Sequence, residues 1–181
     1  MFERTFCALA ACCAVLPLTV AAQSWSDGTD EGEKTPLAGL EVKLPPRPKA
    51  EDLLPFEPRA ASNNRFYIDA ASIDIGADGI VRYTLVIKGP GGGSNISYEG
   101  IRCDTIEQKT YAFARGDGTW VKSRTSEWRQ IVYKSINRQH GVLYVDYFCP
   151  DGGRIKSAAE AIRRFKYGVP PGMPPLFDSV R

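Results

Sequence analysis

The clearest pattern in the chain is an alternation of apolar and polar residues over positions 80–88. Because successive side chains of a strand point to opposite sides, this segment is predicted to be a strand with one apolar face. The residues of that face are Val81, Tyr83, Leu85 and Ile87. The turn signal Asp78-Gly79 precedes the strand, and a glycine-rich connection at 89–93 leads to a second apolar segment at 95–106. The two segments are therefore predicted to form an antiparallel hairpin.

Gly100 lies inside the second predicted strand and bears on its register. In a regular strand, Glu99 would share a face with Ile101 and Cys103, which would bury its carboxylate. A bulge at Gly100 would instead turn Glu99 outward, while Tyr98, Ile101 and Cys103 would point inward. We therefore predict a bulge at this glycine.

The remaining pattern predicts a mostly β domain that ends in a helix. Further strands are expected at 65–69, 110–114, 128–133 and 141–149. In the last of these, Cys149 shares the apolar face, so it is expected to point inward as Cys103 does. The sequence Ser157-Ala158-Ala159-Glu160 has the form of a capping box, and apolar residues at helical spacing follow it up to Gly168. The predicted fold class is α+β, mostly β: an antiparallel sheet of about five to seven strands with one C-terminal helix.

The N-terminus reads as an export signal. Arg4 precedes an uncharged, mostly apolar run at 5–20, and Ala22 with Val20 before it suits signal peptidase. One alternative is a retained membrane anchor, although the run is shorter than the roughly 20 residues of a spanning helix. Another is a lipoprotein, because Leu9-Ala10-Ala11-Cys12 resembles a lipobox and would leave Cys12 lipidated. Cleavage after Ala22 is the prediction, and it leaves no transmembrane helix in the mature chain.

Composition divides the chain into four parts. Residues 1–22 are the expected signal peptide, and 23–60 are an acidic and then proline-rich extended arm. Residues 61–167 form a single β-rich domain, and 168–181 are a proline-rich tail. Leu53, Leu54 and Phe56 are expected to dock the arm on the domain as an extended segment, and the alternative is a motif that a partner recognises.

Cysteine usage agrees with export. Cys7, Cys12 and Cys13 lie in the signal, which leaves Cys103 and Cys149 in the mature chain. Two cysteines in an exported domain predict one disulfide, because the compartment is oxidising. The alternative is a pair of buried free thiols.

Several separated blocks of the sequence occur together in order. They are 65–69, 79–86, 95–103, 111–113 and 147–150, with Trp120 and Trp128 between them. In these blocks the chain resembles the CNP-one-like (CNP1-like) family of proteobacterial exported proteins, over most of 51–165. The resemblance implies an envelope location and a single domain, and it implies no activity, ligand or catalytic residue.

Candidate catalytic and metal-binding chemistry is sparse. His140, the single histidine, is expected in a turn at the surface, without a triad or metal set at recognisable spacing. Asp69, Asp74 and Asp78 do not have the spacing of an EF-hand. We therefore predict no catalytic residue, no metal site and no cofactor.

One group of residues is a candidate ligand-binding site. Its members are Tyr98, Glu99, Arg102, Trp120 and Trp128. A bulge would present Glu99 beside Arg102, and the aromatic side chains would form a wall for a sugar or a peptide. The alternative is that the aromatic residues fill the core while Glu99 and Arg102 form a surface ion pair.

Charge indicates the class of partner. Residues 102–166 contain 13 Lys and Arg against 7 Asp and Glu. The basic body is expected to meet an anionic envelope surface, and the alternative is that the chain's own acidic arm folds back on it. The partner is expected to be an envelope protein or a small ligand, and not a nucleic acid. The sequence therefore predicts a periplasmic, non-enzymatic binding or envelope-associated module. Two alternatives remain open: an enzyme acting on a cell-wall or saccharide substrate through Glu99, and a lipid-anchored envelope assembly factor.

Overall fold

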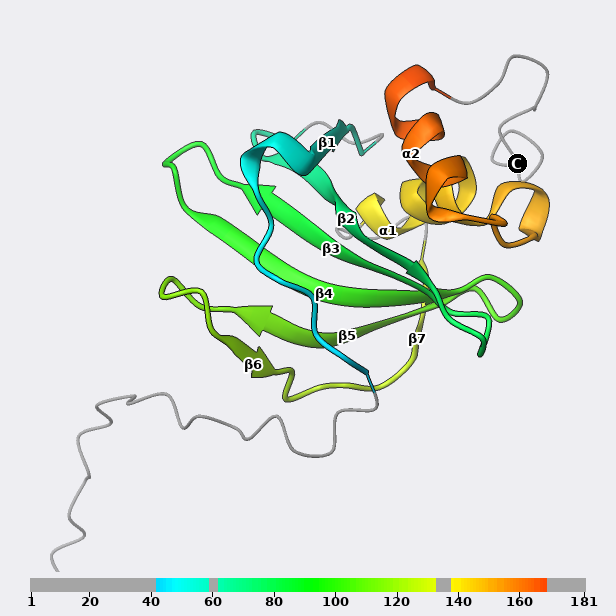
Figure 1. Ribbon diagram of the computed structural model, residues 1–181, viewed down its shortest axis with the longest axis horizontal. Helices are drawn as coiled ribbons and strands as arrows, with labels where there is room; N and C mark the ends of the chain where they lie inside the picture. Colours follow the sequence, from blue (N-terminus) through cyan, green and yellow to red (C-terminus); the bar gives the residue numbers. More distant parts are fainter. Residues whose placement is uncertain (1–41, 59–61, 133–137, 169–181) are drawn as a thin grey trace, which may run out of the picture. The chain divides into compact units, whose positions relative to one another are not determined.

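In a computed structural model of the chain, the structure describes residues 42–58, 62–132 and 138–168, all within the compact unit Lys34–Arg181. The expected signal peptide with Cys12, and the tail from 169 onward, lie outside these residues. The strands are β1 (Leu53–Phe56), β2 (Arg65–Ile75), β3 (Val81–Lys88), β4 (Ser94–Arg102), β5 (Glu107–Ala114), β6 (Trp120–Lys122) and β7 (Arg129–Gln130) (Figure 1). The helices are η1 (Ala50–Asp52), α1 (Arg138–Val142), the π-helical η2 (Leu143–Phe148), η3 (Pro150–Gly152) and α2 (Ala158–Tyr167).

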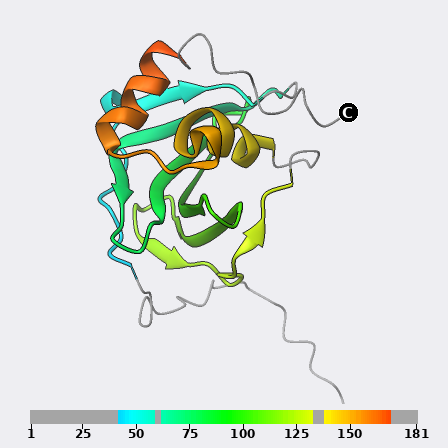
Figure 2. The ribbon, with the colours of Figure 1, turned by 90° about the vertical axis from the view of Figure 1, so that its right-hand side faces the viewer.

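The described strands form one antiparallel sheet of seven in the order β1-β2-β3-β4-β5-β6, with β7 also paired to β5. The predicted α+β, mostly β class is confirmed, as is the hairpin of β3 and β4. Val81, Tyr83 and Leu85 are almost completely buried on the predicted apolar face. The helical segments pack on this face, while residues 42–49 cross the other face (Figures 1 and 2).

The predicted bulge at Gly100 is wrong. Strand β4 pairs with β3 without interruption, and Gly100 lies opposite Arg82 in that ladder. The irregularity falls on the neighbouring strand, because Tyr98 pairs with Ala112 while Glu99 pairs with Thr110, which leaves Tyr111 as the extra residue. Gly100 instead allows a close approach. A Cβ atom at this position would lie 3.0 Å from the Tyr111 ring.

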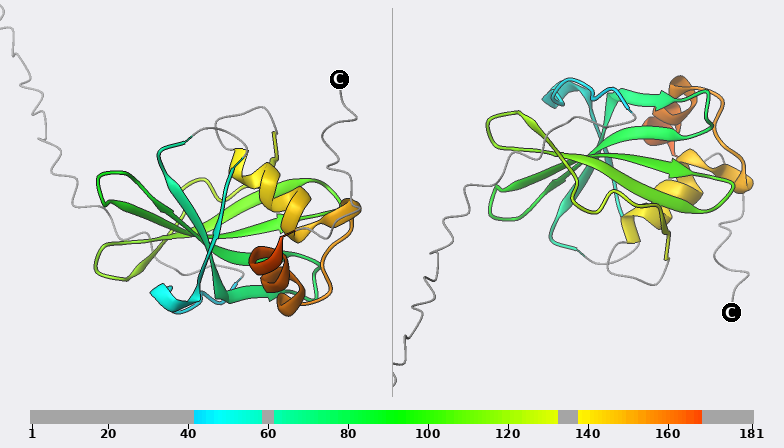
Figure 3. Two further views of the ribbon diagram at one scale, coloured as in Figure 1. Left: turned by 90° about the horizontal axis from the view of Figure 1, so that it is seen from above. Right: turned by 90° about the horizontal axis from the view of Figure 1, so that it is seen from below.

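The C-terminal third of the domain differs from the prediction in one element. The expected strand at 141–149 is helical, formed by α1 and η2, and these lie beside the sheet (Figure 3). Leu143, Tyr144, Val145 and Phe148 are buried in η2. Several neighbouring residues of this segment are apolar, and such a run fits the alternating pattern of a strand as well as the pattern of a helix. The spacing of apolar residues therefore did not distinguish a strand from a helix here. Of the expected strand at 128–133, only β7 forms within the described part.

The predicted C-terminal helix is confirmed as α2. The Ser157 side chain accepts a hydrogen bond from the Glu160 amide at 3.2 Å, and the Glu160 carboxylate accepts one from the Lys156 amide at 2.9 Å. Gly168 ends the helix with a φ of 79°, a conformation that glycine adopts at low cost.

At the other end of the domain, β1 pairs with β2 and buries Leu54 and Phe56. The predicted docking of this segment is therefore confirmed.

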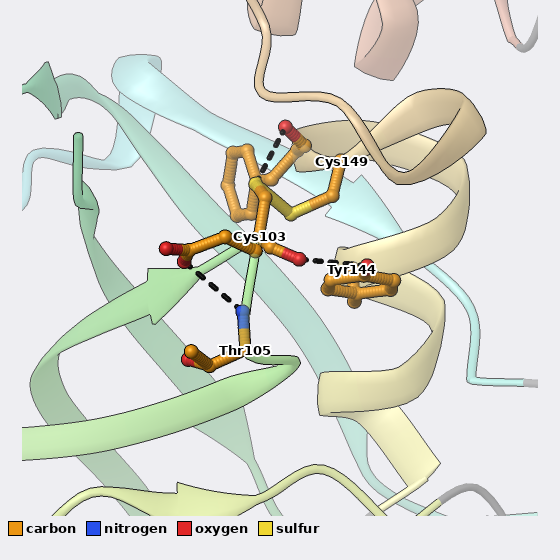
Figure 4. The surroundings of a disulfide bond; sticks show 6 residues. Cys103, Thr105, Tyr144 and Cys149 are labelled. Carbon is orange, nitrogen blue, oxygen red and sulfur yellow. Dashed lines mark hydrogen bonds between the residues drawn. A yellow bond between two sulfur atoms is a disulfide. The ribbon is translucent and has the colours of Figure 1, made fainter.

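The predicted disulfide between Cys103 and Cys149 is confirmed, with 5.4 Å between the two Cα atoms (Figure 4). It joins the end of β4 to the residue after η2. The Tyr144 hydroxyl donates a hydrogen bond to the Cys103 carbonyl oxygen at 2.9 Å and so adds a second link between the same segments. Such a bond is typical of an oxidising environment outside the cytoplasm. In the part of the chain that the structure describes, no helix is long and apolar enough to cross a membrane.

Candidate functional site

Glu99 lies inside the core, where it forms a hydrogen-bonded cluster. Its side chain accepts hydrogen bonds from the Ser97 hydroxyl at 2.6 Å and from the Tyr83 hydroxyl at 3.1 Å. Its other close partner is His140 of α1, with 2.8 Å between Nε2 and the carboxylate. The side chains of Glu99 and His140 are 5% and 9% exposed. The prediction that Glu99 turns outward is therefore wrong, and so is the expected surface position of His140.

The partners of Glu99 offset the cost of its burial. Burial by itself raises the pKa of this carboxyl group, because it penalises the charged form. The charge of His140 and the hydrogen bonds from His140, Ser97 and Tyr83 outweigh burial and lower the pKa below its ordinary value. The carboxylate thus links β4 to β3 and to α1. The geometry makes it a structural group of the core rather than one that faces a bound substrate.

The opposite face of the sheet carries a row of four aromatic rings. Tyr98 on β4 lies 6.3 Å from Trp120 and 5.8 Å from Tyr111, measured between ring centroids. Trp128 continues the row, 6.4 Å from Tyr111 with the two rings perpendicular. Tyr98 and Tyr111 are buried, whereas both tryptophans are half-buried. Burial raises the pKa of Tyr98 to about 12, so its hydroxyl stays protonated at neutral pH.

Cationic side chains lie against this row. The guanidinium of Arg102 lies 3.9 Å from the Trp128 ring centroid, and Lys109 lies 5.3 Å from that of Tyr111. Arg82 lies 5.9 Å from the Tyr111 ring centroid and is held by a two-fold contact with Asp78. That carboxylate raises the pKa of Arg82, against the effect of burial. We call the four rings and these three cations the aromatic face; its residues are Arg82, Tyr98, Arg102, Lys109, Tyr111, Trp120 and Trp128.

Four of the five predicted ligand-binding residues meet on the aromatic face, and Glu99 does not. The alternative ion pair of Glu99 with Arg102 is absent, since Arg102 approaches Glu107 instead, with 3.7 Å between nitrogen and oxygen. The prediction missed Tyr111, which reaches this face through the irregularity in β5. Lys109 shares the face, and the Lys-x-aromatic spacing on a strand was the available signal.

Among the described residues, no group of three or more His, Cys, Asp or Glu side chains is arranged to hold a metal ion. Asp78 of the aspartate set binds Arg82, and Asp69 accepts a hydrogen bond from the Ala71 amide at 3.2 Å.

The comparisons with known proteins place the chain in a family. The model of the CNP1-like family matches residues 32–166, which cover β1–β7 and nearly all of α2. The chain therefore belongs to the CNP1-like family, as its sequence blocks indicated. Neither a curated protein nor a solved structure matches the chain at a significant level.

Proposed function

We propose that this member of the CNP1-like family is an exported, periplasmic, non-enzymatic module that binds an anionic, ring-bearing envelope ligand, such as an acidic saccharide. The observation that supports this is the stacking of Arg102 on Trp128, with Lys109 5.8 Å from the same ring centroid. An aromatic surface with a few fixed polar groups is the usual composition of a ligand site. Arginine that stacks on a ring still presents its N–H groups to a carboxylate or phosphate.

Charge around Trp128 favours an anion. Arg102 and Lys109 lie 3.9 Å and 5.8 Å from its ring centroid, two cations against the carboxylate of Glu107 that approaches Arg102. A surface that combines cations and aromatic rings attracts anionic ligands at long range and holds their rings by contact. We expect such binding to weaken as the salt concentration rises, because salt screens exposed charges.

The burial of Glu99 favours a binding module over an enzyme. The enzyme hypothesis placed this carboxylate beside the aromatic wall, and it lies on the other face of the sheet. The disulfide supports the periplasmic location. Sequencing of the mature N-terminus tests export directly. A start at Gln23 is expected, whereas a lipid-modified Cys12 would establish the anchored assembly factor instead.

The binding proposal is tested with polygalacturonate, an anionic saccharide polymer, and with neutral dextran as the control probe. We expect Trp fluorescence to report binding of the anionic polymer and not of dextran. The variants Arg102→Gln and Trp128→Leu should each weaken binding about tenfold, which corresponds to about 1.4 kcal/mol. Arg163→Gln removes an exposed charge on α2 and should have no effect. Equal binding by the Arg102 and Arg163 variants would exclude the aromatic face as the site.

A further inference from the structure

Residues 42–49 belong to the predicted arm at 23–60, and the name arm is used for 42–49 alone from here on. This segment crosses the aromatic face (Figure 1), and it contacts that face at Trp120. The indole N–H of Trp120 donates a hydrogen bond to the carbonyl oxygen of Pro45 at 2.9 Å. Two residues later, the Arg47 guanidinium donates one to the carbonyl oxygen of Gly116 at 3.2 Å. A fixed pair of contacts therefore holds the arm against the strands.

The sequence of the arm restricts it to an extended form. Proline at 45, 46 and 48 fixes φ, and each residue that precedes a proline is disfavoured in the helical region. Residues 43–49 accordingly form no helix or strand, and Lys49 has extended angles of −98° and 151°. Such a segment approaches polyproline II, which loses little conformational entropy when it binds.

The surface beneath the arm has the features of a site for such a segment. Tyr98 and Trp120 stand edge to face and form an aromatic wall. On the other side of Tyr98, a pocket of about 410 Å³ lies between the arm residues Val42 and Lys43 and the turn that joins β2 to β3. Aromatic walls of this kind dock proline-rich segments in several domain families. Pro45 and Trp120 are both half-buried, so their contact lies at the surface, where a competing segment can reach it.

The β5–β6 turn is shaped for the arginine of the arm. Gly118 has a φ of 87°, and a Cβ atom at this position would lie 3.0 Å from Nη1 of Arg47. Glycine at this place therefore satisfies the turn and leaves room for the guanidinium. The turn thus recognises a basic residue two positions after the proline whose carbonyl binds Trp120.

We propose that Tyr98, Trp120 and the β5–β6 turn form a binding site for extended proline-rich peptides, which the arm fills within the same chain. The external occupant is a proline-rich segment of a partner protein with the pattern Pro-Pro-basic-Pro, the pattern of Pro45 to Pro48. This site does not rest on the anionic ligand at Trp128, which uses the other end of the aromatic face.

The test uses the full chain and a labelled peptide with the sequence of residues 42–50. In the unmodified chain the arm competes at an effective concentration of about millimolar, so peptide binding should be weak. The variant Pro46→Gly with Arg47→Ala weakens the arm, and its affinity for the peptide should rise at least about tenfold. Addition of Trp120→Phe, which keeps a ring and removes the N–H donor, should reverse that gain.

Two controls separate the outcomes. A peptide with alanine in place of the three prolines keeps the charge and should not bind, and Lys49→Ala changes an exposed arm residue that should leave affinity unaltered. Equal binding of both peptides, no gain in the weakened-arm variant, or no effect of Trp120→Phe overturns the inference. Binding of polygalacturonate is measured in parallel in the unmodified chain and in the Trp120→Phe chain. Binding that survives in both shows that only this inference has failed. Absence of binding in the unmodified chain counts against the proposed function, and a loss caused by Trp120→Phe alone overturns the separation of the two sites.

If the double variant does not fold, Trp120→Phe alone decides the question. Trypsin cleavage of the Lys43–Leu44 bond then reports release of the arm, because a protease needs the segment free of the strands. We expect cleavage at least about threefold faster than in the unmodified chain, since one of the two anchoring hydrogen bonds is lost. An unchanged cleavage rate would show that Trp120 does not recognise the arm.

Discussion

Replacement of Glu99 by glutamine tests the buried cluster at its centre. Glutamine has nearly the same shape and can keep three hydrogen bonds, if its oxygen accepts from Tyr83 and His140 and its amide donates to Ser97. What it loses is the negative charge. Hydrogen bonds to charged groups contribute about 1.5–3 kcal/mol and neutral ones about 1 kcal/mol. Glu99→Gln should therefore lower the free energy of unfolding by about 1–3 kcal/mol at pH 7.

The pH dependence of this loss identifies its cause. The pKa of Glu99 lies below its ordinary value of 4.5 in the folded chain. The stabilisation is therefore complete above about pH 4.5, where the unfolded chain is also ionised, and disappears as pH falls through the folded pKa. The difference in free energy of unfolding between the original chain and the Glu99→Gln variant should therefore become smaller as the pH falls below about 4.5.

Urea unfolding followed by circular dichroism at a series of pH values measures both effects. Glu127→Gln is the matched control, because Glu127 is exposed. This substitution should change the free energy of unfolding by no more than about 0.5 kcal/mol. A Glu99 variant as stable as this control at pH 7 would refute a stabilising buried carboxylate. A loss that stays the same at acid pH would show that shape, and not charge, accounts for it.

Three further changes test other parts of the fold. Cys103→Ser should lower the melting temperature by about 5 °C or more under non-reducing conditions, because the bond closes a long loop; a melting temperature that matches the original chain would contradict this. Gly100→Ala should cost about 1–3 kcal/mol in urea unfolding, since its methyl group displaces the Tyr111 ring, whereas Gly116→Ala enters open space and should cost less than about 0.5 kcal/mol. Ser157→Ala should cost about 0.5–2 kcal/mol by loss of the cap of α2, and thermal unfolding with no change would argue against that hydrogen bond.

The sequence predicted an element correctly where its apolar residues followed a single repeat, of two residues for a strand or of about 3.6 for a helix. Strand β3 alternates clearly, and the capping box and Gly168 mark both ends of α2, so these elements were predicted correctly. The segment 141–149 has apolar residues at adjacent positions, and only its packing on the sheet decides between strand and helix. The disulfide was nevertheless predicted correctly. Its prediction rested on the expected export to an oxidising compartment and on the presence of two cysteines in the mature chain, and neither depends on whether 141–149 is a strand or a helix.

Four of the five residues of the candidate site meet on one face, and Glu99 does not, because its position depends on contacts between distant parts of the chain. Tyr98 and Arg102 share a face in any regular strand, but the side taken by Glu99 depended on the register of β4. The partner that stabilises the buried form, His140, lies 41 residues further along the chain on a helix that the pattern did not predict. Without that partner, burial of a carboxylate is unfavourable, and outward rotation was the reasonable expectation.

The Cys103–Cys149 disulfide divides the sheet into two parts. The loop that it closes contains β5, β6, β7, α1 and η2, whereas β1–β4 precede Cys103 and lie outside that loop. The bond therefore does not constrain the pairing of β1–β4, which must rely on the apolar face of β3 and its neighbours. It restricts instead the part of the chain that brings the helical segments onto the sheet. A reductant added during refolding should thus leave the pairing of β1–β4 nearly as fast and act mainly on the attachment of the helices.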